Sequence, residues 1–120
     1  MAFDERFAER VRESLASVPG VTEIKMFGGL CFTVGGNMAV GVVGNELLVR
    51  VAKDDNGDAL LERPHTRPMD FTGKPMRGFL YVTPEGVRTR RALKDWVDRG
   101  VCFASSLPPK KPEQKKRTHR

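Results

Sequence analysis

The sequence is poor in cysteine and histidine, with two of each in 120 residues. Neither Cys31 nor Cys102 has a second thiol or a histidine at metal-ligand spacing, so no metal site or disulfide framework is predicted. Each cysteine lies within an apolar segment, and we expect both to be buried, reduced thiols. No cofactor is expected either.

Long apolar runs are also missing. No run approaches the roughly 18 residues of a membrane span, and Asp4, Glu5 and Arg6 stand where a signal peptide would have its apolar stretch. We therefore expect a cytoplasmic protein without membrane contact. With the single tryptophan, Trp96, expected in the core, Tyr81 alone is too little aromatic surface to predict stacking on single-stranded nucleic acid.

Excess charge of one sign is missing from most of the chain. Residues 1–106 contain 15 basic against 14 acidic residues, whereas residues 107–120 contain 6 against 1. We therefore divide the chain into a domain, 1–106, and a basic Pro/Lys tail, 107–120, which lacks apolar residues beyond Pro109 and is expected to be disordered. The tail either solubilises the protein or contacts nucleic acid or an acidic protein non-specifically, through Lys110, Lys111, Lys115, Lys116, Arg117 and Arg120.

Apolar residues at helical spacing predict a helix at each end of the domain. The first runs from Phe3 to Val18 and ends at Pro19-Gly20. The second carries an apolar stripe that includes Gly100, where a glycine within a helix predicts close backbone approach to a sheet; its members are Leu93, Trp96, Val97, Gly100, Val101 and Ala104.

Between these helices the pattern predicts strands. Short apolar runs at 22–27, 30–34, 38–43 and 46–51 are separated by glycine-rich pairs, which predicts a four-strand meander joined by hairpin turns. A fifth strand is predicted at 78–82, a short helix or turn at 54–62, and a loop at 65–75 because of its prolines. The expected fold class is α+β, an antiparallel sheet of about five strands flanked by N- and C-terminal helices.

Strand alternation assigns the residues of this sheet to two faces. We expect the helices to cover the face formed by Leu30, Phe32, Val34, Met38, Val40, Val42, Leu47, Val49, Val51, Phe79 and Tyr81. The second face is also apolar, with Arg50 as its main charge. Either the 65–75 loop or a second copy of the chain is expected to cover it, which makes a homodimer through this sheet face one prediction.

The densest titratable set in the domain lies in and beside the predicted loop. Structural loop contacts and surface solvation explain such residues, and an anion or small-ligand site is the functional alternative; the set is His65, Arg67, Asp70, Lys74 and Arg77, with Arg50 added from the sheet. No catalytic residue is assigned, because one histidine without a nearby nucleophile does not define a catalytic site. The glycines of 28–36 are followed by strands rather than a helix, and we interpret them as hairpin turns rather than a phosphate loop.

The run Met26-Phe27-Gly28-Gly29, then Gly36-Asn37-Met38 and 47–51, resembles the N-terminal domain of the TfoX/Sxy family. Arg67-Pro68-Met69 through Val82 and the Trp96 helix are similar to single-domain members of that family. The resemblance implies an α+β domain and a family of bacterial competence regulators, which act with a cyclic-AMP receptor protein on promoters. Those regulators carry a second, helical domain, where this sequence has the Pro/Lys tail.

Two functions follow as hypotheses. The first is a non-catalytic regulatory or interaction domain, associated with DNA or protein. The second is a small-ligand or anion-binding domain, or a weak enzyme, that uses the 65–77 segment and Arg50.

Overall fold

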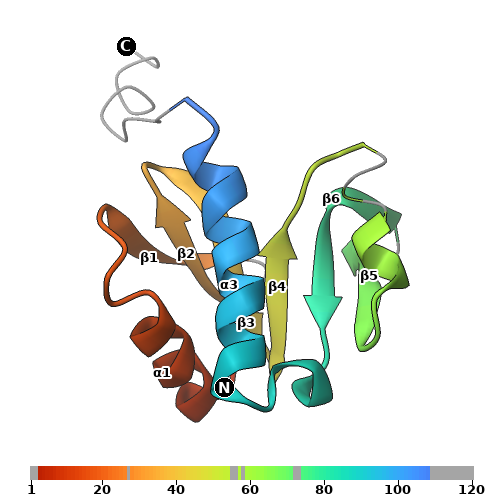
Figure 1. Cartoon of the computed structure of the whole chain (residues 1–120), viewed down its shortest axis with the longest axis horizontal. Helices are drawn as coiled ribbons and strands as arrows, with labels where there is room; N and C mark the ends of the chain where they lie inside the picture. The colour runs from red at the N-terminus through yellow and green to blue at the C-terminus, as the bar shows by residue number, and fades with distance from the viewer. Residues whose placement is uncertain (1–2, 27, 55–56, 58, 72–73, 109–120) are drawn as a thin grey trace.

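Six strands form one antiparallel sheet at the centre of the molecule, in the order β1-β2-β3-β4-β6-β5 (Figure 1). The computed structural model describes residues 3–26, 28–54, 57, 59–71 and 74–108, except for the side chains of 26, 70, 71 and 74–77. The strands are β1 (Val21–Met26), β2 (Gly29–Val34), β3 (Asn37–Val43), β4 (Glu46–Arg50), β5 (Thr66–Phe71) and β6 (Lys74–Val82). The predicted α+β class is confirmed, with six strands rather than about five.

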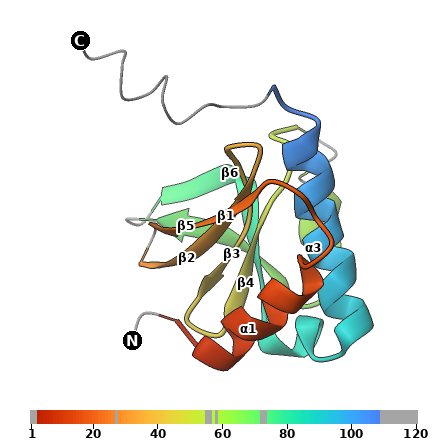
Figure 2. The same cartoon turned by 90° about the vertical axis from the view of Figure 1, so that its left-hand side faces the viewer.

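Helices α1 (Glu5–Ser14) and α3 (Arg90–Ser105) cover one face of this sheet (Figure 2). The Asp4 carboxylate accepts hydrogen bonds from the backbone N–H groups of Arg6 and Phe7 and so begins α1. The Thr89 hydroxyl caps α3 in the same way through the N–H of Ala92. Both predicted helices are confirmed, although α1 ends at Ser14, earlier than predicted.

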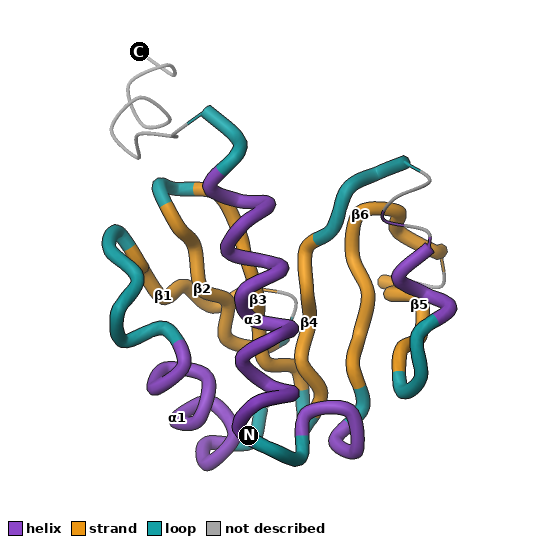
Figure 3. Tube along the Cα trace, in the orientation of Figure 1, coloured by secondary structure: helices purple, strands orange, loops and turns teal. Residues whose placement is uncertain are grey.

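Among the described residues, short 3₁₀ helices lie in the connections before β5 and after β6, and Figure 3 draws them as helix. The first, η1 (Leu60–Glu62), lies in the segment predicted as a short helix or turn. The second, η2 (Pro84–Val87), joins β6 to α3. Within the described residues, no helix is both long enough and apolar enough to span a membrane.

Glycine turns join the first four strands as predicted. Gly35 and Gly36 both have positive φ angles, 60° and 84°, at the turn between β2 and β3, and Gly44 has a φ of 59° between β3 and β4. Such angles give the twist that two-residue hairpin loops require, and glycine adopts them without steric penalty. The meander of β1 to β4 is therefore confirmed.

The prediction of a loop at 65–75 is wrong. Residues 66–71 form β5, which pairs with β6, and β6 begins at Lys74 rather than Gly78. A proline is tolerated because β5 is an edge strand, where the missing N–H has no neighbouring strand to meet. The pairing also shifts register between Pro68 and Asp70, which is typical of a bulge at a sheet edge.

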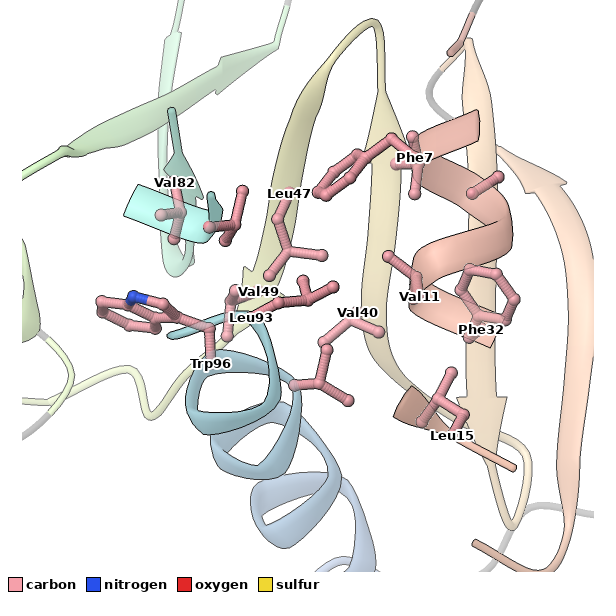
Figure 4. Packing of buried hydrophobic residues seen from close by; sticks show 14 of the residues in the cluster. Phe7, Val11, Leu15, Phe32, Val40, Leu47, Val49, Val82, Leu93 and Trp96 are labelled. Carbon is pink, nitrogen blue, oxygen red and sulfur yellow. The ribbon is translucent and has the colours of Figure 1, made fainter. Parts of the chain in front are cut away.

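The main core lies between the sheet and the two helices (Figure 4). Phe7 and Val11 of α1 and Trp96 of α3 pack against Val40 and Leu47 of the sheet. The apolar stripes predicted for both helices are confirmed, and the backbone of Gly100 lies directly against β3, as its place in the stripe predicted. Trp96 is 6% exposed, which confirms that it is a core residue.

The predicted face is wrong for Met38 and for the four residues of β6 from Phe79 to Val82. Leu80 and Val82 of β6 join the main core, because they pair in register with Val49 and Leu47 of β4. Phe79 and Tyr81 therefore lie on the other face, and Met38 joins them beyond a register shift between β2 and β3. Alternation could not fix these faces because the strand starts and the irregularity were not visible in the pattern.

The second face is buried within one chain. Cys31, Leu48 and Met69 have no exposed surface, and Met38 and Tyr81 are nearly covered. Met69 comes from β5, so the 65–75 segment contributes to this cover, which was one of the two expected alternatives. The homodimer stays a prediction, and these residues do not need a second copy for their burial.

Candidate functional site

The predicted anion or ligand set begins with His65, which lies just before β5. His65 is exposed and has a φ of 68°, the only positive φ among the described non-glycine residues. Its carbonyl oxygen accepts a hydrogen bond from the N–H of Thr83 at 2.8 Å. The backbone of His65 therefore closes the end of the sheet next to η2.

Arg67 of the same set lies on the second face of the sheet. Its guanidinium stands 4.4 Å from the ring centroid of Tyr81, and its Nε donates to the Glu46 carboxylate at 3.1 Å. The ion pair and the stacked ring hold this arginine across β4, β5 and β6. Arg67 thus makes structural contacts, which was the explanation given for this set of residues besides an anion or small-ligand site.

Arg50 lies elsewhere, at the end of β4, and its guanidinium is 5.5 Å from the ring centroid of Phe103 in α3. The structure therefore brings Arg50 to the helical side and leaves His65 and Arg67 at other places. The side chains of Asp70, Lys74 and Arg77 lie outside the described residues. A single anion site built from all six residues stays a prediction, and the described members do not converge.

Arg50 borders a pocket of about 640 Å³ between the end of β4 and the C-terminal half of α3. Its walls combine apolar surface with a few charged groups. Val51, Leu60, Cys102 and Phe103 are among the apolar lining residues, and Asp98 and Arg99 are among the charged ones. The sequence pattern did not indicate this pocket, because Cys102 and Phe103 lie outside the predicted apolar stripe of α3. The available signal was Phe103, a large apolar side chain seven residues after Trp96 that borders the stripe.

Cys102 is exposed on this wall, so the prediction that both cysteines are buried is confirmed only for Cys31. Burial of Cys31 raises the pKa of its thiol to about 11, because the thiolate loses its hydration there. The two free thiols therefore differ strongly in their access to solvent. An apolar sequence neighbourhood did not separate them, because consecutive residues of a helix point in different directions.

Cationic side chains gather where α1 meets the beginning of α3. Arg10 of α1 donates to the carbonyl oxygens of Val87 and Arg88, at 2.8 and 3.2 Å, and so joins α1 to the end of η2, just before α3. A groove of about 740 Å³ lies alongside, with Arg10, Arg90 and Lys94 among its lining residues. We call the following set the arginine surface: Arg6, Arg10, Arg88, Arg90, Arg91 and Lys94.

Carboxylates also lie beside this arginine surface. Asp4 is engaged as the cap of α1, and Asp98 is paired with Lys94 at 3.2 Å. Glu13 lines the groove with the arginines. The near-neutral total of residues 1–106 concealed this clustering, because a sum over a sequence does not show which charges share a surface.

A separate ion-pair network joins α1 to β1. Arg12 donates to Glu23 at 2.7 Å and to Glu9 at 2.9 Å. The hydrogen bond to Glu23 is the main reason that the pKa of Arg12 lies above its ordinary value. Within the described part of the chain, no three His, Cys, Asp or Glu residues are grouped as metal ligands.

The described residues include only Leu107 and Pro108 of the predicted tail, so the predicted polyanion contacts of Lys110 to Arg120 lie outside the described residues. The last described residue, Pro108, accepts a hydrogen bond from the side-chain amide of Asn37 at 2.9 Å through its carbonyl oxygen. Asn37 is 2% exposed and starts β3. The point from which the tail departs is therefore attached to the sheet.

Comparison with protein families gives one match, to the TfoX N-terminal domain, over residues 13–104. Comparisons with curated proteins and with solved structures give no match. The matched region includes the whole sheet and most of α3. It also includes the glycine turns and the Trp96 helix that carried the resemblance. The chain therefore belongs to the TfoX N-terminal domain family.

Proposed function

We propose that this chain is a non-catalytic regulatory domain that binds nucleic acid through phosphate contacts made by the arginine surface and the basic tail. The family supports a regulatory role. The observation that carries the binding proposal is the concentration of exposed arginines around the joined ends of α1 and α3. From the sequence alone, nucleic-acid contact was predicted only for the tail. The arginine surface adds a second contact region, on the folded domain.

The arginines of this surface are available for an outside anion. Within the described residues, Arg6, Arg88, Arg90 and Arg91 form no ion pair with another side chain, and all four are exposed. Arg90 and Arg91 lie in the first turn of α3, where the positive end of the helix dipole adds to their charge. A phosphate backbone repeats its negative charge along the strand, and each planar guanidinium can bind two oxygens of one phosphate, so this partner suits several arginines at once.

Such contacts give affinity without sequence preference and weaken as salt displaces them. For duplex DNA, the slope of log K against log salt falls by about 0.9 for each phosphate neutralised. The measurement is binding of duplex DNA to the full chain over a salt series, by fluorescence anisotropy. Arg90→Gln/Arg91→Gln is expected to weaken binding and to reduce the slope by about 1 to 2.

Two further variants separate the components. Deletion of 107–120 should also reduce the slope of log K against log salt. If the arginine surface and the tail bind independently, this reduction and that of Arg90→Gln/Arg91→Gln should add. Lys25→Gln removes an exposed cation from the edge strand β1 and serves as the matched control, with no change expected. An unchanged affinity and slope in Arg90→Gln/Arg91→Gln would remove the arginine surface from the proposal. Binding to an acidic protein but not to duplex DNA would contradict it altogether.

A further inference from the structure

We propose that the pocket between β4 and α3 binds a small molecule that carries one carboxylate on an apolar body. The first observation is the state of Arg50. This side chain is half-buried at the pocket wall, and no ion pair joins it to another described residue. A partly desolvated guanidinium with free donors is a natural partner for a carboxylate, which it binds through two parallel hydrogen bonds.

Arg50 contacts α3. Its Cζ atom lies 5.5 Å from the ring centroid of Phe103, so the cation is next to an aromatic ring rather than an acid. An aromatic ring leaves the hydrogen-bonding capacity of the guanidinium N–H groups for a ligand. A preformed donor group of this kind loses little side-chain entropy when it binds.

Apolar side chains supply the rest of the pocket. Val51 is 6% exposed at its base, and Leu60 and Phe103 are half-buried at its sides. Small-molecule pockets have this composition, with a mostly apolar wall and a few polar groups that fix orientation. The volume of about 640 Å³ lies within the usual range for such sites.

The charges of the pocket select against anions of higher charge. Asp95 and Asp98 line it together with Arg50 and Arg99, so two carboxylates balance two guanidinium groups. A ligand with one negative charge neutralises the charge of Arg50 when it pairs with it. A phosphate group, which is close to doubly charged at neutral pH, would meet the repulsion of the two aspartates.

This inference concerns a different part of the molecule from the arginine surface. Its residues lie at the C-terminal half of α3 and the end of β4, whereas the arginine surface is formed by α1 and the beginning of α3. Unchanged DNA binding in Arg90→Gln/Arg91→Gln would contradict the proposed function and would leave the inference about the pocket in place. Failure of the ligand test would likewise leave the proposed function in place.

Cys102 provides a local reporter of occupancy. It is exposed and lines the pocket, while Cys31 is fully buried and its thiol is held in the neutral form, so a thiol reagent should modify Cys102 selectively. The experiment measures the rate at which Ellman's reagent modifies the full chain, with and without benzoate or octanoate at millimolar concentration. Calorimetric titration of the same carboxylates gives the affinity.

We expect benzoate or octanoate to slow modification of Cys102, with inorganic phosphate and adenosine monophosphate having no such effect. Arg50→Gln should weaken carboxylate binding by about tenfold or more and abolish the protection. Arg63→Gln is the matched control, because Arg63 stands over Trp96 of α3 at the same 5.5 Å but does not line the pocket.

Three results with the unaltered chain would overturn the proposal. They are absence of calorimetric binding by both carboxylates, binding that leaves the reactivity of Cys102 unchanged, and equal protection by inorganic phosphate. Retention of carboxylate affinity in Arg50→Gln would also overturn it. The ratio of rates with and without ligand is compared for each variant, because loss of Arg50 can alter the intrinsic reactivity of the neighbouring thiol.

Discussion

Gly100 of α3 lies in direct contact with the backbone carbonyl of Ala39 in β3. A Cβ atom at position 100 would overlap that oxygen and would lie 2.7 Å from the side chain of Val40. The helix therefore rests on the sheet at its glycine, and the spacing between the two layers is set there. Because the obstacle is backbone rather than a flexible side chain, it cannot move aside without shifting the strand.

Gly100→Ala is expected to lower the free energy of unfolding by about 2 kcal/mol, because overpacking of the contact outweighs the gain of about 1 kcal/mol in helix propensity. Urea denaturation measures the difference. Ser105→Ala, at an exposed position of the same helix, should show no loss. Equal or greater stability of Gly100→Ala would contradict the close approach.

Thr89→Ala is expected to lower stability by about 1 kcal/mol, since the hydroxyl of Thr89 accepts the N–H of Ala92 at the first turn of α3. Thr89→Ser retains the oxygen and should recover nearly all of this loss. Thermal denaturation of the three proteins gives the comparison. If Thr89→Ser is as unstable as Thr89→Ala, the effect does not come from the cap.

The raised pKa of Cys31 predicts a loss of stability at alkaline pH. The unfolded chain releases the thiol proton near its ordinary pKa of 9.0, whereas the folded chain retains it up to about 11. The folded state therefore binds more protons between these values, and stability falls as pH rises through this window. Below pH 9 the contribution is fully present.

The measurement is urea denaturation at several pH values from 8 to 11. Cys31→Ala removes the thiol and should make the decline with pH shallower, although its stability at pH 8 is lowered by the lost packing. Comparison of slopes rather than of absolute values excludes the titration of other groups. Parallel slopes for the two proteins would show that Cys31 does not titrate in this way.

The positive φ of His65 predicts that the stability of variants at this position depends on the backbone conformation more than on the imidazole ring. His65→Val should lower stability by about 1 to 2 kcal/mol, because a β-branched residue is strained at this angle. His65→Gly relieves the strain and should leave stability unchanged or higher. Urea denaturation measures the stability of both variants. A large loss of stability in both would show that the imidazole ring, rather than the backbone angle, stabilises the fold.

Sequence periodicity predicted the helical layer well, for a physical reason. The stripe around Trp96 and Gly100 repeats every three to four residues, and such a stripe has only one way to face a sheet. The 65–75 segment could not be predicted in the same way. Whether Pro68 breaks a strand depends on its being at the sheet edge, and that is decided by β6, which pairs with β4 on its other side and leaves β5 outermost.

The candidate surfaces were the least predictable features. Arg50 was identified as the unusual charge of an apolar strand, but its neighbour Phe103 is more than fifty residues away. Arg10 and Arg88 likewise meet only because α1 packs beside α3. Sites assembled from distant segments depend on tertiary packing, which a single sequence read by local pattern does not specify.

The hydrogen bond from Asn37 to Pro108 fixes where the remaining residues depart, at the opposite end of α3 from Arg90. A helix of 16 residues is about 24 Å long. Along a DNA duplex this separation corresponds to about seven base pairs. An oligonucleotide shorter than about seven base pairs cannot reach both ends of α3 along the duplex axis. The shortest duplex that binds with full affinity therefore measures the distance between the two regions that contact it.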